Sequence, residues 1–182
     1  MNILLLFLVL FQNTSQNLDK KITFHNHKAD YYYHRGDYPN MLYHLIEKVK
    51  LDKHDMNSYS DIAYYYWSLS IDDKIRKEEF ENKAIKYLNE GLGNNKDYAY
   101  FYDELGQFYI RKKDFKTAKK FFEQAIKRKD VPLTSFHMLS NLLLKEDNVS
   151  GAKSILKECI LKFPNDNKAK SKLRELENTP NY

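Results

Sequence analysis

Hydrophobic and small residues recur at helical spacing through residues 97–130, in two runs that a polar turn, Lys112-Lys113-Asp114, separates. Within each run the spacing places these positions on one face of a helix. The first run is Tyr102, Leu105, Gly106 and Tyr109, and the second is Phe115, Ala118, Phe122, Ala125 and Ile126. Gly106 and Ala118 are small, as is needed where two helices pass closely. The stretch therefore predicts one helical hairpin.

The hairpin pattern repeats along the chain. After a forward shift of 34 residues, small positions fall on small ones and large apolar positions on large apolar ones. The shifted positions are Phe136, Leu139, Ser140, Leu143, Val149, Ala152, Leu156, Cys159 and Ile160. A backward shift of 34 takes the second run onto Ala84, Leu88, Gly91 and Leu92, but the first run needs a shift of 43, onto Tyr59, Ile62, Ala63 and Tyr66. A further shift of 34 takes Ala63 to Ala29 and Tyr66 to Tyr32, so four hairpins are predicted, the second with nine extra residues.

The nine extra residues are predicted to add turns at the start of a helix. Ser70 and Asp73 have the spacing of a capping box, which marks a helix start. The following DDKIRKEEFENKA contains strong helix formers and no breaker. We therefore expect a helix over Ile71–Leu92 that projects beyond its neighbours by about 13 Å, with the insertion at Ile71–Glu79. An extended loop is the alternative.

The repeated unit resembles the tetratricopeptide repeat, whose 34-residue helical hairpins stack into a right-handed superhelix. The resemblance rests on Leu105-Gly106, Tyr109, Asp114-Phe115, Ala118, Phe122, Ala125 and Pro164. The first unit departs from the pattern, with Met41 and Lys48 where small residues are usual. The resemblance implies an all-α, right-handed α-solenoid of about four hairpins over residues 22–178. The hairpins are expected at about 22–55, 56–96, 97–132 and 133–166, followed by a capping helix at 167–177 and a tail at 179–182.

Composition fits one all-helical domain. The 182 residues are 42% hydrophobic and 15% aromatic, with 5 Gly and 4 Pro. A formal net charge of +5 biases the protein towards acidic partners. The single cysteine, Cys159, excludes an internal disulfide and is expected to be a buried small side chain, with a reactive thiol as the alternative.

The N-terminal apolar run, Ile3–Phe11, has the length of a signal-peptide core. It is shorter than the roughly 20 residues that a membrane-spanning helix needs. We expect a signal peptide over residues 1–15, a polar linker over 16–21, and export to the periplasm or outside the cell. The alternatives are an uncleaved anchor, or an apolar helix that caps the solenoid of a cytoplasmic protein.

The resemblance also implies that the first helix of each hairpin lines a concave groove in which a peptide or protein segment lies. Helical geometry then gives an inward face that combines aromatic rings with amides, acids and cations, a composition enriched at interfaces. The predicted groove residues are Tyr33, His34, Tyr64, Trp67, Tyr100, Asp103, Gln107, Arg111, His137, Asn141 and Lys145. Trp67 is the first choice for an anchor, and the alternative is that these rings only fill gaps between hairpins. The family's lysine-rich clamp for C-terminal carboxylates is not expected, because Asp30, Asp61 and Glu104 occupy positions that need cations.

A basic patch on the outer face offers a second mode of binding. It comprises Lys112, Lys116, Lys119, Lys120 and Lys127, within residues 111–129. It could dock an acidic protein, nucleic acid or an anionic membrane surface, although no interleaved aromatics support base stacking. The alternative is an ordinary solvated helix face, which explains the patch without any partner.

Motifs for catalysis and cofactors are missing from the sequence. It contains no Gly-rich phosphate loop, no GxSxG, no HExxH and no Cys/His metal spacing. We therefore predict a non-enzymatic interaction module without cofactor or metal, whose main partner is a protein or peptide.

Overall fold

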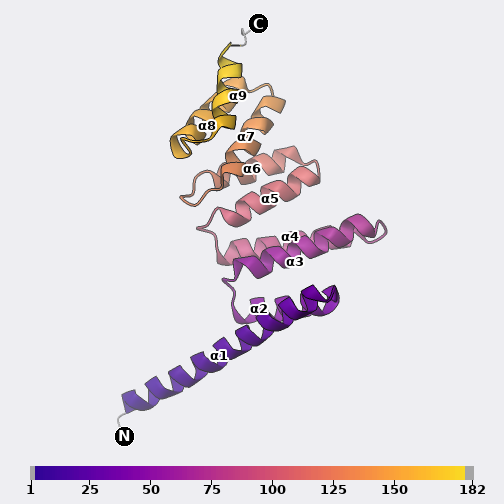
Figure 1. Ribbon diagram of the computed structural model, residues 1–182, viewed down its shortest axis with the longest axis vertical. Helices are drawn as coiled ribbons and strands as arrows, with labels where there is room; N and C mark the ends of the chain where they lie inside the picture. Colours follow the sequence, from indigo (N-terminus) through magenta and orange to yellow (C-terminus); the bar gives the residue numbers. More distant parts are fainter. Residues whose placement is uncertain (1–2, 179–182) are drawn as a thin grey trace. The chain divides into compact units, whose positions relative to one another are not determined.

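The computed structural model describes residues 3–178, and its side chains from Thr14 onward. This part of the chain contains nine α-helices and no strand, which confirms the all-α prediction (Figure 1). The helices are α1 (Ile3–His34), α2 (Tyr38–Leu51), α3 (Met56–Asp72), α4 (Lys77–Asn94), α5 (Tyr100–Arg111), α6 (Phe115–Ala125), α7 (Leu133–Lys145), α8 (Val149–Lys162) and α9 (Asn167–Asn178). They form two compact units, of which unit 1 ends at Asn95 and unit 2 begins at Lys96. The tail predicted at 179–182 lies outside the described residues.

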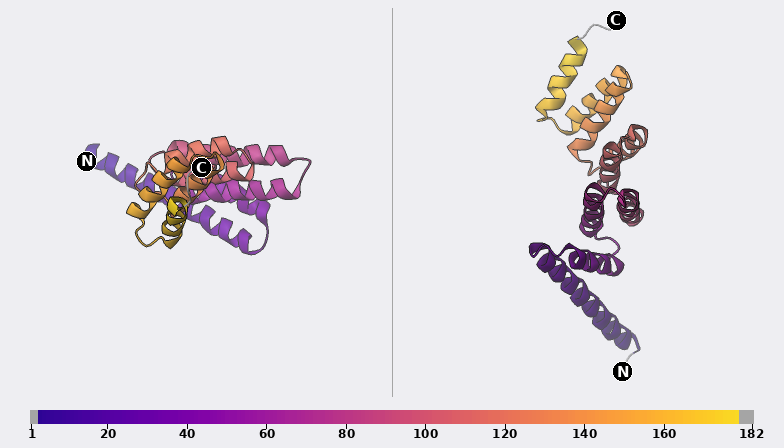
Figure 2. Two further views of the ribbon diagram at one scale, coloured as in Figure 1. Left: turned by 90° about the horizontal axis from the view of Figure 1, so that it is seen from above. Right: turned by 90° about the vertical axis from the view of Figure 1, so that its right-hand side faces the viewer.

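Unit 1 consists of two hairpins, α1–α2 and α3–α4, joined by packing of α2 on α3. Helix α1 is 32 residues long and continues well beyond its contact with α2 (Figure 2). The linker predicted at 16–21 is instead helical, because nothing between Ile3 and His34 is a glycine or a proline. In the part of the chain that the structure describes, no helix has both the length and the apolar character to cross a membrane.

Three of the four hairpin turns have the same backbone structure. Gly36, Lys113 and Asp147 each adopt a positive φ, at 69°, 61° and 56°. The following backbone N–H bonds the carbonyl five residues earlier, at 3.0 Å from Asp37 to Tyr32 and at 2.9 Å in the other two turns, which makes each a Schellman motif. The residue after each positive-φ residue is the N-cap of the second helix of its hairpin. The side chains of these residues, Asp37, Asp114 and Asn148, each accept a hydrogen bond from the backbone N–H three residues later. The repeat is therefore visible in the turns as well as in the core.

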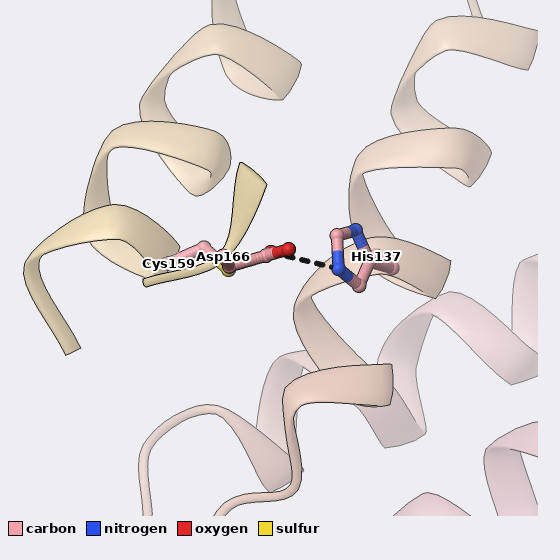
Figure 3. Close-up of side chains that lie close together, drawn as sticks. All are labelled: His137, Cys159 and Asp166. Carbon is pink, nitrogen blue, oxygen red and sulfur yellow. Dashed lines mark hydrogen bonds and ion pairs between the residues drawn. The ribbon is translucent and has the colours of Figure 1, made fainter. Parts of the chain in front are cut away.

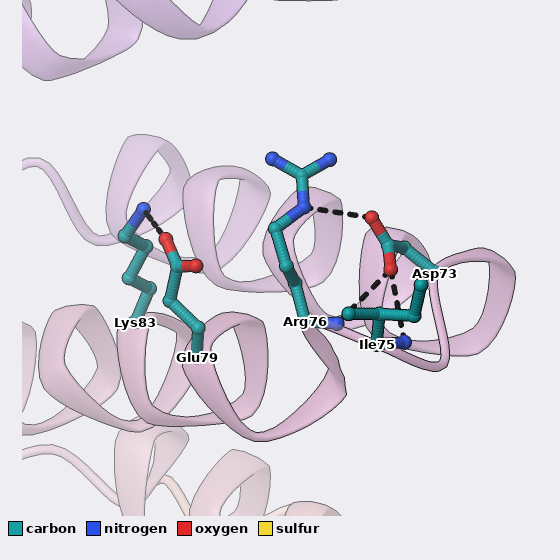
Figure 4. Close-up of polar contacts among 5 residues, drawn as sticks. All are labelled: Asp73, Ile75, Arg76, Glu79 and Lys83. Carbon is teal, nitrogen blue, oxygen red and sulfur yellow. Dashed lines mark hydrogen bonds and ion pairs between the residues drawn. The ribbon is translucent and has the colours of Figure 1, made fainter.

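The remaining hairpin turn, between α3 and α4, contains the insertion and differs from the prediction. Helix α3 ends at Asp72 and α4 begins at Lys77, so Ser70 lies inside α3 and donates to the Trp67 carbonyl at 2.6 Å. Asp73 organises the turn instead, accepting at 3.0 Å from the backbone N–H groups of both Ile75 and Arg76 (Figure 4). The predicted capping box at Ser70 and the predicted helix start at Ile71 are therefore wrong.

The nine extra residues are shared almost equally between the two helices. Helix α5 ends two residues after Tyr109, whereas α3 ends six residues after the equivalent Tyr66. Helix α4 likewise begins four residues earlier than α6 does relative to the repeat, and the turn takes the last extra residue. The added turn of α4 contributes Phe80, whose ring stacks on Tyr66 at a centroid distance of 6.3 Å. Tyr66 also stacks on Tyr87 at 5.9 Å, as the equivalent Tyr109 does on Phe121 in the shorter hairpin.

Unit 2 consists of two hairpins and a final helix. Hairpins α5–α6 and α7–α8 lie against each other, and α9 covers α8 (Figure 1). A Cβ built on Gly106 would lie 2.7 Å from the ring of Phe122, so the glycine allows the close approach of α5 and α6. Phe101 and Phe108 are also buried in the core, although neither belongs to the repeated positions.

Candidate functional site

A cleft of about 1120 Å³ in unit 1 brings together predicted groove residues from α1 and α3. Tyr33 and Tyr64 line it, and both are well exposed, at 57% and 66% of their surface. The buried Met41 and Leu45 of α2 lie at its base. The full lining is Asn26, His27, Ala29, Asp30, Tyr33, Tyr38, Met41, Leu45, Asp61, Tyr64, Tyr65, Ser68, Leu69 and Asp72. The cleft therefore combines an apolar base with exposed tyrosines.

The charge of this cleft is negative. The described residues that line it include Asp30, Asp61 and Asp72, together with His27, and no lysine or arginine. Desolvation by the surrounding protein, followed by repulsion from Asp55, raises the pKa of Asp61 above its usual value. A cation placed in the cleft would relieve this repulsion.

Lys48 ties the wall of the cleft to the helices behind it. Its Nζ donates to Asn26 Oδ1 at 2.8 Å and pairs with the Asp55 carboxylate at 2.9 Å. Asp55 also caps α3 through Ser58. Burial raises the pKa of Asp55, but the hydrogen bonds from Lys48 and Ser58 and the Lys48 charge outweigh it, so the pKa lies below its usual value. Lys48, which stands where the repeat usually has a small residue, thus links α2 to α1 and to the start of α3.

Trp67 and His34 lie near the cleft but outside its lining. The Trp67 ring is half-buried, with its centroid 5.9 Å from that of Tyr64. His34 is exposed and lies 3.4 Å from the Asp30 carboxylate, one helical turn away. Tyr64 is the more accessible aromatic side chain, which makes it a better candidate for the anchor than Trp67.

The predicted groove residues of unit 2 are largely engaged within the chain. Asp103 is buried, and its carboxylate accepts from Gln107 at 2.6 Å, from Thr134 at 3.3 Å and from Ser135. This carboxylate therefore joins α5 to α7 instead of facing a ligand. Residue spacing does not reveal this role, because Ser135 reaches Asp103 from the next hairpin.

Other predicted groove residues in unit 2 also have neighbours in the chain. Asn141 accepts from Lys172 of α9, and the Lys145 ammonium lies 4.2 Å from the centroid of the Phe115 ring. Tyr100 is half-buried, and Arg111 is exposed at the end of α5.

His137, Cys159 and Asp166 form a compact group in unit 2 (Figure 3). His137 Nε2 lies 2.9 Å from Asp166 Oδ2, and Cys159 Sγ lies 3.6 Å from the same oxygen. Burial and the neighbouring Asp166 carboxylate raise the pKa of the Cys159 thiol to about 12. Cys159 is buried, as predicted, but His137 faces this group at 13% side-chain exposure. No sequence motif marks the group, because its members are spaced irregularly.

The predicted basic patch is divided among different elements. Helix α6 ends at Ala125, so Lys127 lies after it, and Lys112 lies in the turn before it. Lys119 pairs with Glu146, while Lys116 and Lys120 are exposed on α6. Of the five predicted patch residues, only Lys116, Lys119 and Lys120 therefore lie on α6.

Comparison with known proteins finds a family model that matches one segment of the chain. Residues 99–131 match the tetratricopeptide repeat model. A search of curated proteins gave no significant match. Among solved structures, the chain is similar to MamA, with a TM-score of 0.63 and 15% identity over 87% of this chain and 81% of that one. It is also similar to TTC0263 from Thermus thermophilus, a thermophilic TPR protein, with a TM-score of 0.59 and 17% identity over 82% and 77% of the two chains.

A third similar structure is YrrB, described as a TPR protein with an unusual peptide-binding site. Its TM-score is 0.55, with 23% identity over 72% of this chain and 63% of that one. At identities below 25%, these structural similarities show a shared fold only. The family match at 99–131 coincides with the α5–α6 hairpin and its flanking turns. The chain therefore contains a tetratricopeptide repeat and has the fold of tetratricopeptide-repeat proteins.

Proposed function

We propose that this chain is a non-enzymatic protein-interaction module that binds an extended segment of a partner protein in the unit 1 cleft. The observation that carries the proposal is the cleft itself, where Tyr33 and Tyr64 stand exposed above an apolar base. Exposed tyrosines offer large contact area at low entropic cost and can also form hydrogen bonds. The peptide-binding site of YrrB, which has the same fold, supports this use of the architecture.

The chemistry of the cleft favours a segment that carries lysine or arginine. Asp30, Asp61 and Asp72 supply negative charge, which Lys48, bonded to Asn26 behind the lining, offsets only in part. Tyrosine faces also attract cations, with energies of about 0.5–1 kcal/mol at exposed sites. A basic side chain flanked by apolar residues would therefore fit both the carboxylates and the base of the cleft.

A library of extended peptides tests this proposal. Binding to the full chain is measured by fluorescence anisotropy, with each Lys- or Arg-containing peptide matched to a version in which Glu replaces the cation. We expect the basic peptides to bind, and Tyr64→Ala and Asp61→Asn to weaken them by about tenfold or less each. Tyr43→Ala is the matched control, because Tyr43 is also exposed, at 56%, but is absent from the cleft. A preference for the Glu versions would refute the proposed chemistry.

Electrostatic docking through α6 is a second candidate, favoured by the exposure of Lys116 and Lys120. The partner would be an acidic protein, nucleic acid or anionic membrane surface. Binding of this kind falls steeply with salt and survives Tyr64→Ala. Reversal of both lysines to Glu would abolish it while leaving binding in the cleft unchanged.

We also propose that residues 1–15 direct export to the periplasm or the cell exterior. The support is the apolar run Ile3–Phe11, which has the length of a signal-peptide core. N-terminal sequencing of the protein from its native host tests the proposal. Mature protein beginning near Gln16 is expected, and an intact Met1 in a cytoplasmic fraction would contradict it.

A further inference from the structure

Three side chains of different donor type converge in unit 2 from separate parts of the chain. His137 comes from α7, Cys159 from α8, and Asp166 from the connection between α8 and α9 (Figure 3). One ligand atom from each lies within 4.8 Å of the other two. The imidazole, thiol and carboxylate are the three donor groups that Zn²⁺ takes in proteins.

The separations between these atoms approach those of a metal site. Zinc bonds of about 2.0–2.3 Å in tetrahedral geometry place neighbouring ligand atoms about 3.3–3.7 Å apart. The Sγ–Oδ2 distance between Cys159 and Asp166 is 3.6 Å, and the Nε2–Oδ2 distance between His137 and Asp166 is 2.9 Å. Small side-chain movements would therefore open the group enough to admit an ion.

The Asp166 carboxylate is held in position by the chain around it. Its Oδ1 accepts from the backbone N–H of Lys168 at 3.1 Å, at the start of α9. This bond directs Oδ2 towards His137 and Cys159. Partners that orient a ligand in this way are typical of metal sites. The side chains of His137 and Asp166 are only 13% and 8% exposed, so the group lies close to the surface but is mostly shielded from water.

We propose that His137, Cys159 and Asp166 bind one divalent transition-metal ion of the Zn²⁺ type, with a fourth position open to water. The thiol loses its proton to solvent when the ion binds, and no electron is transferred. The bound ion joins α7 to the α8–α9 connection and stabilises unit 2. The site is independent of the unit 1 cleft and of the function proposed for it.

The repeat itself supplies a conservative variant for testing the site. Position 159 corresponds to position 125, 34 residues earlier, where alanine is fully buried. Cys159→Ala should therefore fold while lacking the sulfur ligand. His137→Gln removes the nitrogen ligand, and His25→Asn is the control, because His25 and His44 form a separate pair of imidazoles with their Nδ1 atoms 3.0 Å apart.

The experiment titrates the metal-free full chain with Zn²⁺ and with Co²⁺, using Mg²⁺ as a negative control. We expect one Zn²⁺ per chain, a rise in Tm of roughly 5 °C or more at saturating Zn²⁺, and a Co²⁺–thiolate charge-transfer band. His25→Asn should retain all three signals, whereas Cys159→Ala and His137→Gln should lose them. Circular dichroism without metal confirms that each variant is folded.

Two results would overturn the proposal. Wild-type protein that binds no Zn²⁺ would show that the group is an internal contact between His137, Cys159 and Asp166 only. Equal Zn²⁺ binding by Cys159→Ala and wild type, or loss of binding in His25→Asn, would place the ion elsewhere.

Discussion

Replacing Gly106 with alanine tests the packing on which the repeat assignment depends. The new Cβ would lie 2.7 and 2.8 Å from two atoms of the Phe122 ring, closer than carbon atoms can approach without movement. Phe122 is fully buried, so its ring cannot move without displacing its neighbours. Overpacking of this kind costs about 1–3 kcal/mol, and the better helix propensity of alanine returns up to about 1 kcal/mol. A net destabilisation of about 1–2 kcal/mol is expected.

The repeat also predicts how this loss can be reversed. In the second and fourth hairpins, Ala63 and Ser140 occupy the position of Gly106, and leucine replaces Phe122 at Leu88 and Leu156. The double variant Gly106→Ala/Phe122→Leu should therefore be more stable than the sum of its two single changes by about 1 kcal/mol or more. Urea unfolding followed by circular dichroism measures all four members of this cycle. A Gly106→Ala protein as stable as wild type, or strictly additive effects, would refute the packing argument.

Three further substitutions test particular contacts, each by urea unfolding. Asp55→Asn keeps the helix cap but breaks the ion pair with Lys48, so it should cost about 1–2 kcal/mol at pH 7. Because the folded pKa of Asp55 is depressed, the ion pair contributes stability above the unfolded pKa and loses it as the pH falls below about 4. The stabilities of variant and wild type should therefore converge at low pH. A constant difference down to pH 2 would contradict this reasoning. Lys113→Gly should stabilise the protein by about 0.5–1 kcal/mol, because glycine adopts the positive φ without strain; destabilisation would show that the turn conformation is wrong. Asp103→Asn should cost about 1–3 kcal/mol, because the new amide NH₂ would face groups that now donate to the carboxylate, including Ser135. An unchanged unfolding midpoint would show that the hydrogen bonds of Asp103 do not stabilise the fold.

Most of the hairpin boundaries could be predicted because the same packing recurs along the chain. Small residues mark where helices cross, so Gly106 and Ala118 locate the α5–α6 hairpin without knowledge of distant contacts. The insertion was harder to place, because Ser70 and Asp73 are both suitable for capping and helix formers follow each. The structure extends both helices, and the added turn of α4 places Phe80 against the ring of Tyr66.

The candidate sites were only partly predictable, because helical geometry gives the direction of a side chain but not its neighbours. It directed Tyr33 and Tyr64 towards one surface, and in the structure both line one cleft. The same reasoning directed Asp103 towards the groove, although Ser135 of the next hairpin buries it. The approach of Cys159 to Asp166 likewise depends on the chain reversal between α8 and α9, which residue spacing does not reveal.

The ratio of dissociation constants between two tyrosine variants tests the central claim most directly. A lysine-containing peptide selected from the library is titrated into wild-type protein, Tyr64→Ala and Tyr43→Ala at the same ionic strength. Because Tyr64 lines the acidic cleft and Tyr43 does not, we predict that Kd rises several-fold for Tyr64→Ala and is unchanged for Tyr43→Ala. Equal affinities for all three proteins would show that the partner segment does not bind in the cleft.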